Sequence, residues 1–512
     1  MASQGVTLGH ITRRNASLFP DRLCIACGDE QFTFDQFNRR VNRLANALAG
    51  LGVTREDRVA YLNFNCHRSV EIKFALGKLG AVEVPLNFRL VGEEIVYIVN
   101  DAEAKVFLLG AEFRELVESV GSRLETVRHY VAVGGGGGML DWEEFAGAAS
   151  DREPGVDVDE DDVVIQMYTS GTTGKPKGCM LTHRNIIEAA YGMNSEWNLT
   201  EKDFMVAAQP IFHIATAGIM FATLYAGGSS VILRSFNPVQ FLEFIQKYRA
   251  TFTGLLPQAA RVVLLHPDLK KYDLSSLRFF VTAYEPDLIK KAGELLGCSI
   301  MEYYGSTETT ANVTFHNHTA TGFQKLTSCG RPARNVEVKI VDDDDNELPT
   351  GQVGEIVVRG ASNMKGYWKL PGPTAETLRG GWLHTGDMGY LDEDRYLYIK
   401  DRKKDMIRTG GENVYCKEVE DVIYTHPAVY EAAVIGVPDE RWGETVKAVV
   451  ALKEGASATA GEIIEHCKKY LASYKKPTSV DFVKALPRNS SGKVVKVALR
   501  EQYWAGYDRR IN

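Results

Sequence analysis

Apolar and polar positions change their spacing along this chain in a way that predicts alternating strands and helices. Short apolar runs, typical of buried strands, lie at 59–63 and 82–86 and flank a segment with helical spacing near 69–79. An amphipathic helix ending at Gly50 is predicted earlier, because apolar positions recur at helical spacing: Phe37, Val41, Leu44, Ala45 and Leu48. The alternation continues over the first ~400 residues and favours a layered α/β architecture.

The pattern becomes strand-rich towards the C-terminus. Strands are predicted at 336–341 and 354–358, and we interpret the acidic run Asp342–Asp345 between them as a solvated hairpin tip rather than a metal site. A charged segment follows the strand at 396–399, and beyond it lie a helix near 417–424 and strands near 432–437 and 445–452. We therefore place a domain boundary there, between an N-terminal domain, 1–402, and a C-terminal domain, 403–512.

Composition and charge narrow the class of protein. A chain of 512 residues exceeds the size at which one core stops growing, and 45% hydrophobic with 24% charged residues is typical of a soluble globular protein. With 59 basic against 66 acidic residues, the net charge of −7 gives no electrostatic reason to expect nucleic acid or an anionic membrane as partner. No apolar run approaches the ~20 residues of a membrane span, and the N-terminus shows no secretory signal.

The eight cysteines are scattered, and only Cys24 and Cys27 stand close together. They lie in a strand-like segment without a second pair or neighbouring histidines, so a structural interpretation is favoured over a metal site or a redox pair. This usage of cysteine predicts a reducing, cytoplasmic setting.

Residues 168–178 read Tyr-Thr-Ser-Gly-Thr-Thr-Gly-Lys-Pro-Lys-Gly and combine glycines, hydroxyl groups and lysines. Glycines let backbone N–H groups approach phosphate oxygens, hydroxyl groups add donors, and lysines add positive charge. A buried strand is predicted at 163–167 and a helical pattern begins at His183, so we expect the loop to join a strand to a helix, a natural anion site. The loop indicates a polyphosphate ligand, with a flexible surface loop as the alternative.

This loop is not a Walker A motif. That motif needs four residues between its first glycine and the Gly-Lys-Ser/Thr run. Here two residues separate Gly171 from Gly174, and Pro176 follows Lys175. An ordinary P-loop nucleotide hydrolase is therefore disfavoured.

Four further segments carry candidate chemistry. Tyr303–Glu308 offers an aromatic face, a close-approach glycine, a hydroxyl and a carboxylate, and Trp382–Asp387 presents an aspartate after a tight turn. Asp401–Asn413 joins a basic stretch to a glycine pair, and Pro487–Lys493 places a lysine on a short glycine turn. Together with the loop at 168–178, these segments form an ordered set that extends almost to the C-terminus.

The ordered set resembles the adenylate-forming superfamily of acyl-CoA synthetases, adenylation domains and firefly-type luciferases. Gly410–Asn413 and Arg441–Glu444 are similar to the acid:CoA ligase branch. The resemblance implies a large N-terminal domain of stacked α/β sheets with a small β-barrel, followed by a small mobile C-terminal α+β domain. It also implies an enzyme that activates a carboxylic acid with ATP and Mg²⁺ as acyl-AMP, releasing pyrophosphate, and then transfers the acyl group to coenzyme A.

The motifs of this family imply roles for individual residues. Lys493 is expected to be the catalytic cation that bridges carboxylate and phosphate oxygens, with a surface lysine as the alternative. Thr307 would contact the α-phosphate, Glu308 would ligate Mg²⁺, and Asp387 with Arg402 would bind the ribose. Tyr304 would stack on adenine unless it is a core tyrosine. The remaining expected contacts to ATP or AMP are Thr169, Ser170, Gly171, Thr172, Thr173, Gly174, Lys177, Gly305 and Ser306.

The resemblance also suggests positions for a hinge, coenzyme A and the acid. Lys404 falls at the family's hinge, although a solvated lysine is the alternative. The expected coenzyme A contacts are Gly410, Gly411, Trp442 and Lys475. The expected acyl pocket comprises His213, Thr282, Ala283, Tyr284 and Tyr303, and a core histidine is the alternative for the first of these.

The acid itself is left open, because the chain departs from the family pattern at Tyr284 and Glu285, which are bulkier than usual. If their side chains face the ligand, they favour a short, cyclic or aromatic acid, and if they face away, nothing follows about the acid. The expected substrate is therefore a medium- or long-chain fatty acid or a cyclic or aromatic acid. The expected partners are the acid, ATP and coenzyme A, without nucleic acid or stable membrane insertion, and a homo-oligomer stays open. The rival functions are an adenylating enzyme that loads a carrier protein and an inactive nucleotide-binding protein.

Overall fold

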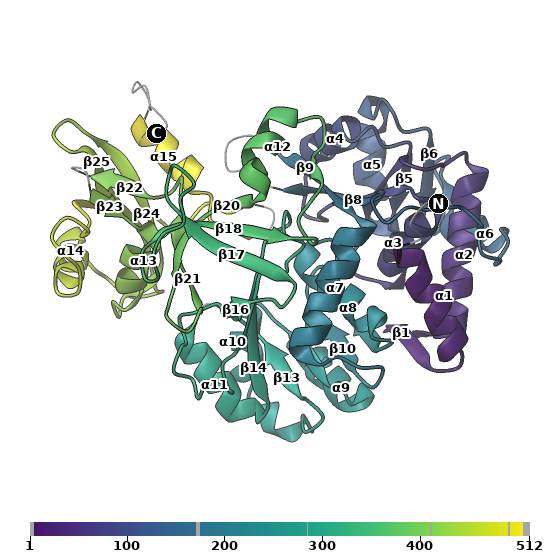
Figure 1. The fold of residues 1–512 in the computed structure, drawn as a ribbon, viewed down its shortest axis with the longest axis horizontal. Helices are drawn as coiled ribbons and strands as arrows, with labels where there is room; N and C mark the ends of the chain where they lie inside the picture. Colours follow the sequence, from purple (N-terminus) through teal and green to yellow (C-terminus); the bar gives the residue numbers. More distant parts are fainter. Residues whose placement is uncertain (1–4, 170–174, 284, 410–411, 490–491, 505–512) are drawn as a thin grey trace. The chain divides into compact units, whose positions relative to one another are not determined.

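The computed structural model describes residues 5–169, 175–283, 285–409, 412–489 and 492–504. The chain forms two compact units, each built from separate stretches of sequence (Figure 1). The first unit comprises Met1–Val338, Val357–His384 and Asp394–Leu397, and the second comprises Lys339–Ile356, Thr385–Glu393 and Tyr398–Asn512. Among the described residues, no helix is both long and apolar enough to cross a membrane.

The first unit contains two large sheets. In its described residues the larger sheet has the strand order β16-β15-β14-β13-β12-β10-β11-β1-β2. Strands β1, β10, β11, β12, β13 and β14 run parallel to their neighbours within this set, as expected for an α/β architecture. The strands are β1 Leu23–Cys27, β2 Glu30–Thr33, β10 Phe204–Ala207, β11 Ser229–Ile232, β12 Phe252–Gly254, β13 Phe279–Val281, β14 Ser299–Tyr304, β15 Thr314–Asn317 and β16 Arg331–Pro332.

The second sheet of this unit has the described order β19-β9-β8-β4-β3-β5-β6-β7. Strands β3 to β8 are parallel along this path, whereas β9 is antiparallel to both β8 and β19. The strands are β3 Arg58–Leu62, β4 Val82–Pro85, β5 Val106–Leu109, β6 His129–Ala132, β7 Leu140–Asp141, β8 Val163–Thr169, β9 Lys177–Thr182 and β19 Gly366–Tyr367.

A layer of helices separates the two sheets. Helix α3 contacts β1 of the first sheet and β4 and β8 of the second, while α7 contacts β9 and packs on α8, which contacts β10 and β11. Every residue of α3 except Arg68 is buried, as expected for a helix enclosed on all sides. The enclosed charge of Lys73 is paired with Glu83 of β4 at 2.7 Å. The layer comprises α1 Leu8–Leu18, α3 His67–Leu79, α7 His183–Trp197 and α8 Ile214–Tyr225.

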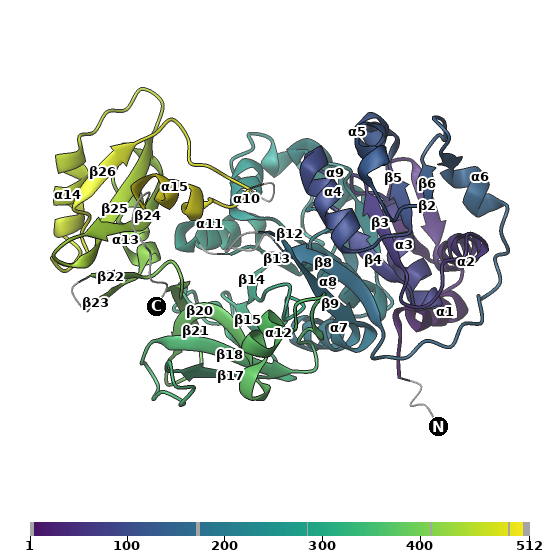
Figure 2. The same ribbon diagram turned by 90° about the horizontal axis from the view of Figure 1, so that it is seen from above.

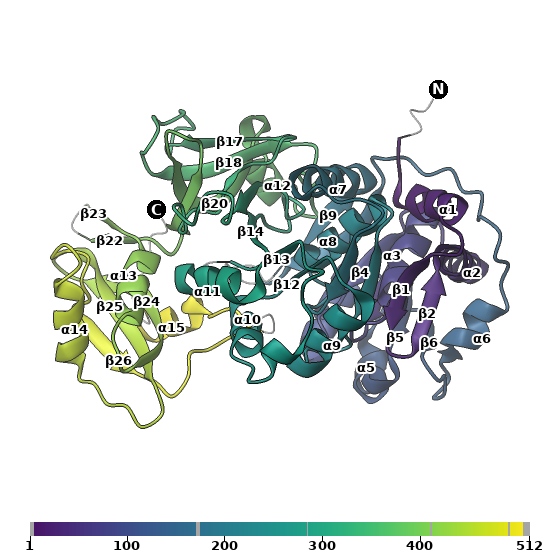
Figure 3. The same ribbon diagram turned by 90° about the horizontal axis from the view of Figure 1, so that it is seen from below.

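Further helices cover the outer faces of both sheets. One apolar cluster joins α9, α10 and α11 to the larger sheet, and another joins α4 and α5 to β5 and its neighbours. Figure 2 shows these helices beside the strands of the two sheets. The helix predicted from apolar spacing is confirmed as α2, which lies beside β1 and β2 (Figure 3). These helices are α2 Phe34–Gly50, α4 Gly92–Asp101, α5 Arg114–Val120, α6 Trp142–Gly147, α9 Pro238–Tyr248, α10 Pro257–Leu264, α11 Pro286–Leu296 and α12 Pro371–Thr377.

The prediction that the loop at 168–178 joins a strand to a helix is wrong. Strand β9, Lys177–Thr182, lies between the loop and α7, and it pairs antiparallel with β8. Its burial is decided by neighbours far away in sequence, because Cys179 pairs with Met167 of β8 on one side and Tyr367 of β19 on the other. The loop is therefore the connection of a β-hairpin and has no helix N-terminus behind it.

The second unit contains a sheet with the described order β23-β22-β25-β24, and β26 adds to β25. Helices α13 and α14 share one apolar cluster with this sheet, and α15 shares the other, so the helices cover opposite faces. These elements are β22 Ile407–Thr409, β23 Glu412–Val414, α13 Cys416–Tyr424, β24 Val429–Asp439, β25 Gly443–Leu452, α14 Ala460–Lys468, β26 Ser479–Phe482 and α15 Lys496–Trp504.

A further sheet has the order β17-β18-β20-β21, and the residue ranges of the two units divide its strands. Its strands are β17 Val336–Val341, β18 Gly354–Gly360, β20 Leu383–Leu391 and β21 Leu397–Arg402. The predicted turn at Asp342–Asp345 is confirmed, since the backbone N–H of Asp342 donates to the carbonyl of Asn346 at 3.0 Å. The predicted α/β fold class is confirmed as well.

Candidate functional site

Most predicted site residues of the first unit follow the carboxyl ends of parallel strands. His213 lies after β10, Thr282 and Ala283 follow β13, and Tyr304 ends β14 directly before Gly305. Because these strands are parallel, their carboxyl ends meet at one edge of the sheet, where ligands of open α/β sheets bind.

The glycine-rich loop leaves the corresponding edge of the second sheet. Strand β8 is parallel to β4 and ends at Thr169, whose register partner across the hairpin is Lys177. Ser170, Gly171, Thr172, Thr173 and Gly174 lie outside the described residues. The two strand ends that hold the loop thus place a hydroxyl and a lysine opposite one another.

Gly305 occupies a position that no other residue can take without movement of the backbone. A Cβ atom at this position would lie 2.5 Å from the carbonyl carbon and 2.6 Å from the Cα of Ala311. The chain returns there because Ser306 and Thr309 close a tight turn, in which the Ser306 N–H donates to the Thr309 hydroxyl at 2.9 Å. The close-approach glycine predicted from the sequence thus approaches the backbone of its own loop.

We expect Gly305→Ala to destabilise the protein by about 1–3 kcal/mol, the range for overpacking at a tight position. Backbone atoms cannot turn away as a flexible side chain can, so the turn of 306–311 must shift. Urea unfolding followed by fluorescence would measure the change. Gly147→Ala is the matched control, because nothing lies within 4 Å of a Cβ at Gly147; equal stability of the two variants would contradict the interpretation.

Glu308 and Lys177 are linked by one tyrosine. The Tyr367 hydroxyl donates to Glu308 Oε1 at 2.9 Å, and Lys177 Nζ lies 5.0 Å from the centre of the Tyr367 ring. Burial, followed by the neighbouring Glu308, raises the pKa of Tyr367, so the phenol keeps its proton and remains a donor. The sequence reasoning missed Tyr367, and the Gly-Tyr pair at 366–367 offers no local signal for it.

The Glu308 carboxylate is suited to be a ligand of Mg²⁺. Its Oε2 accepts no hydrogen bond from the residues that the structure describes, and Mg²⁺ is commonly held by one or two carboxylates together with substrate phosphates and water. No group of three or more histidine, cysteine or acidic side chains within the described ranges could hold a metal ion by itself. A metal at Glu308 would therefore depend on oxygens supplied by a ligand.

The two tyrosines before Gly305 have different surroundings. Tyr304 is 6% exposed and pairs with Thr314 of β15. Tyr303 makes an edge contact with Trp197 at 5.7 Å and stacks on Phe315 at 6.1 Å, and burial raises its pKa. The structure places Tyr303 within an aromatic cluster of the first unit.

Four of the five predicted acyl-pocket residues lie within the described ranges: His213, Thr282, Ala283 and Tyr303. His213 is the N-cap of α8, and its ring lies 4.7 Å from that of Phe212. Thr282 is 2% exposed, and its hydroxyl has no hydrogen-bond partner among the described residues. Glu285 forms an ion pair with Arg261 of α10, and Tyr284 lies outside the described residues.

In the second unit, the two predicted ribose ligands are in contact. Arg402 Nε lies 2.6 Å from Asp387 Oδ1, and the aspartate is 5% exposed. The expectation that Asp387 follows a tight turn is wrong, because it lies inside β20, after Gly386 with φ of 70°. Strand β20 continues through this glycine and lies between β18 and β21 in the sheet. The contact between Asp387 and Arg402 supports a shared role, since one guanidinium orients the carboxylate.

Lys404 lies in the turn that follows β21. It has an acidic residue on each side in sequence, Asp401 near the end of β21 and Asp405 in the turn. Burial lowers the pKa of Lys404 to about 8, an effect that Asp405 opposes, and burial raises the pKa of Asp401 to about 6. Arg500 of α15 donates to the Lys404 carbonyl at 3.2 Å. The segment is therefore held by its surroundings rather than freely solvated.

Lys493 lies at the exposed end of a short antiparallel turn. Arg488 and Val494 form a bridge across it, and the Lys493 N–H donates to Asn489 Oδ1 at 2.9 Å. Arg488 forms an ion pair with Glu431 of β24, which is 6% exposed. A buried carboxylate thus anchors the base of the turn that presents Lys493.

Two of the four predicted coenzyme A contacts, Trp442 and Lys475, lie within the described residues. Trp442 is 46% exposed, and the guanidinium of Arg441 lies 4.5 Å from its ring centre. Lys475 is paired with Glu418 at 2.7 Å. Gly410 and Gly411 lie outside the described residues, between β22 and β23.

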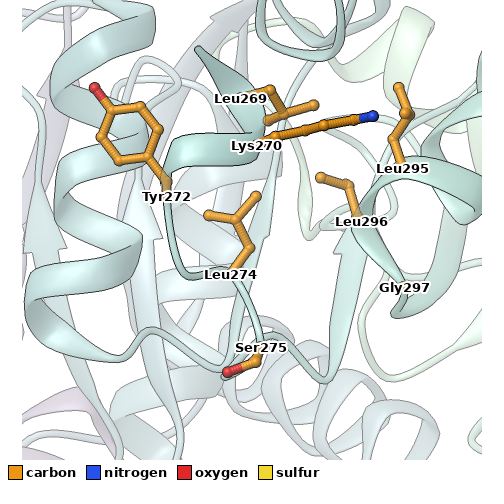
Figure 4. A pocket seen from close by; sticks show the side chains of 8 residues that line it. All are labelled: Leu269, Lys270, Tyr272, Leu274, Ser275, Leu295, Leu296 and Gly297. Atoms are coloured by element: carbon orange, nitrogen blue, oxygen red, sulfur yellow. The ribbon is translucent and has the colours of Figure 1, made fainter.

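A hollow of about 440 Å³ lies between residues 269–275 and the C-terminal end of α11 (Figure 4). It is lined by leucines of two segments, 269–274 and 295–296, and by Lys270, and it contains none of the predicted site residues. Since β14 begins at Ser299, this hollow adjoins the amino ends of the strands. It is therefore separate from the edge that carries Gly305.

Comparisons with known proteins show the family to which the chain belongs. Residues 12–368 match the family model described as AMP-binding enzyme, and residues 418–493 match that of the AMP-binding enzyme C-terminal domain. The chain belongs to the AMP-binding enzyme family. The resemblance to adenylate-forming enzymes, and to their acyl-CoA synthetase branch, is thereby confirmed.

Relatives of this AMP-binding enzyme align along nearly its whole length. A feruloyl-CoA synthase of an Amycolatopsis species is 38% identical, over 98% of this chain and 100% of its own. The fatty acid–[acyl-carrier-protein] ligase ScoC of Streptomyces coeruleorubidus is 36% identical, over 99% and 98%. The crystal structure of ATP-bound MatB from Rhodopseudomonas palustris has a TM-score of 0.88 and 31% identity, over 98% and 100%.

Proposed function

We propose that this AMP-binding enzyme is an acid:CoA ligase. It takes ATP, Mg²⁺ and coenzyme A, activates a carboxylic acid as acyl-AMP with release of pyrophosphate, and transfers the acyl group to the thiol of coenzyme A. The proposal is supported by family membership and by relatives that are named as ligases of CoA or of a carrier protein.

One observation of the structure carries this proposal furthest. Tyr367 joins Glu308 to Lys177, so the candidate metal ligand lies beside the strand that closes the glycine-rich loop. A carboxylate for Mg²⁺ beside a cation and hydroxyl groups is the arrangement that binding of a polyphosphate requires. Bound Mg²⁺ would neutralise charge on the phosphates and orient them.

The other site residues take roles in the same scheme. The loop residues 169–174 and Lys177 would hold the β- and γ-phosphates, and Thr307 the α-phosphate. Tyr304, with Gly305 and Ser306, would contact the adenosine. Asp387 would accept hydrogen bonds from the ribose diol while Arg402 orients it, as their 2.6 Å contact supports.

Lys493 would stabilise the charge that accumulates on the α-phosphate as the carboxylate attacks. A fixed cation at that point stabilises the transition state more than the ground state. We assign residues 403–512 as the lid that presents Lys493, with Lys404 as its hinge. Gly410, Gly411, Trp442 and Lys475 would serve coenzyme A in the second half-reaction.

The class of acid is proposed from the relatives alone. An aromatic or other cyclic acid is favoured, because feruloyl-CoA synthase is a relative over the whole chain. A medium- or long-chain fatty acid and a carrier protein are the second candidates, since ScoC is named for both.

A panel of aromatic and aliphatic acids with ATP, Mg²⁺ and coenzyme A would test the proposal. Pyrophosphate release and thioester formation are scored for each acid, with and without coenzyme A. We expect an acid-dependent thioester without any added protein partner. Pyrophosphate release without a thioester would favour the carrier-protein alternative, and release with no acid at all would contradict the proposal.

A further inference from the structure

The two residues that flank Lys404, Lys403 and Asp405, both form ion pairs with other parts of the second unit. On one side, Lys403 Nζ lies 3.1 Å from Glu355 of β18 and 2.9 Å from Asp343 of the acidic turn. On the other side, Asp405 forms an ion pair with Arg500 of α15. The proposed hinge is therefore gripped by charged groups from elements distant in the sequence.

The guanidinium of Arg500 contacts two neighbouring residues of the hinge segment, Lys404 and Asp405. Its Nη2 pairs with Asp405 Oδ1, while its Nη1 donates to the carbonyl of Lys404 at 3.2 Å. The side chains of Arg500 and Asp405 are 6% and 15% exposed. A forked guanidinium holding two acceptors fixes direction as well as distance, which a lysine in the same place could not do.

The helix that carries Arg500 begins directly after the turn of Lys493. Helix α15 starts at Lys496, which pairs with Glu420 of α13 at 2.7 Å, and Leu499 packs into the apolar cluster of β24 and β25. Lys496 and Arg500 thus hold this helix at two points, and only Val494 and Val495 separate Lys493 from its first residue. Any slip of α15 along Asp405 would displace Lys493.

We propose that Arg500 is a positioning residue for Lys493. By holding the Lys404 carbonyl and Asp405, it fixes α15 to the hinge segment, so that a rotation about Lys404 moves Lys493 as part of one rigid body. This inference rests on the proposed function. It requires no contact between Arg500 and a substrate.

Alignment of a catalytic group is sensitive to small displacements, and an error of about 1 Å can cost about 100-fold in rate. We therefore expect Arg500→Gln to lower acid-dependent pyrophosphate release by roughly 10- to 100-fold. Thioester formation from supplied acyl-adenylate does not use Lys493 and should change less than about threefold. Asp405→Asn should have the same selective effect, and the double variant should lose no more than Arg500→Gln alone.

A second comparison separates positioning from general weakening of the fold. In the Lys493→Ala background, Arg500→Gln should cause no further loss of pyrophosphate release, because the group it positions is already gone. Lys447→Gln is the matched control, since it removes another partly buried pair of the second unit, with Asp481 at 2.9 Å. This control should leave the ratio of the two half-reactions unchanged.

Two results would overturn the inference: an equal loss of both half-reactions in Arg500→Gln, or a further loss in the Lys493→Ala background. If Arg500→Gln does not fold, Arg500→Lys retains the charge without the fork, and a selective loss of adenylation is again expected. Pyrophosphate release by the unmodified enzyme is the separate test of the proposed function. Its absence with every acid would reject that function rather than the role of Arg500.

Discussion

Lys493→Ala is expected to lower acid-dependent pyrophosphate release by about 100- to 1,000-fold, the usual cost of removing one group that stabilises transition-state charge. The lysine is presented on a turn anchored by Arg488 and the buried Glu431, so alanine removes the charge without removing the support of the turn. Thioester formation from supplied acyl-adenylate should remain within about threefold of the unmodified enzyme. Rapid-quench measurement of each half-reaction would give both rates.

The matched control for this variant is Lys484→Ala. Lys484 is an exposed lysine of the same unit, shortly before the Lys493 turn in sequence. Its loss should leave both half-reactions unchanged. An equal fall of both half-reactions in Lys493→Ala would contradict the assignment of Lys493 and the proposed rotation of the lid together.

Glu308→Gln should lower adenylation by about 100-fold at a fixed Mg²⁺ concentration, because an amide retains the oxygen but lacks the charge that a hard cation prefers. Part of the loss should be recovered at high Mg²⁺, since weaker binding can be offset by concentration. Pyrophosphate release measured over a Mg²⁺ titration would separate weaker metal binding from a lower maximal rate.

Tyr367→Phe is expected to have a smaller effect on Mg²⁺ binding than Glu308→Gln. It removes the 2.9 Å hydrogen bond to Glu308 and leaves the carboxylate in place. Partners that orient metal ligands typically contribute about 10- to 100-fold in metal affinity, so the Mg²⁺ requirement should rise while the maximal rate is largely retained. An unchanged Mg²⁺ dependence in both variants would contradict a metal at Glu308.

Sequence patterns predicted those features whose causes are local. Helix α2 was predictable because its apolar stripe lies within one segment. Its N-terminus is also fixed locally, since Thr33 and Gln36 form a capping box there. Gly305 was predictable as a point of close approach, since a glycine between a strand and small hydroxylated residues is typical of a tight return of the chain.

Other features depend on partners that no local pattern reveals. Strand β9 was missed because it is short, directly precedes α7, and owes its burial to β8 and β19 on either side. Tyr367 reaches Glu308 across 59 positions of sequence, and Arg500 reaches Asp405 across 95. Only the folded chain brings such pairs together, so the supporting contacts of the site had to come from the structure.

The interleaving of the two units has a consequence for synthesis on the ribosome. The N–H of Leu397 donates to the carbonyl of Gly330 at 2.8 Å, so the first unit lacks this closing contact until residue 397 has emerged. By then the stretch Lys339–Ile356 of the second unit has already left the ribosome and awaits its partners from Tyr398 onwards. Domains of many nascent chains fold in succession, from the N-terminal one onwards. In this chain the second unit begins to emerge before the first is complete, and the two must finish folding in overlapping stages of translation.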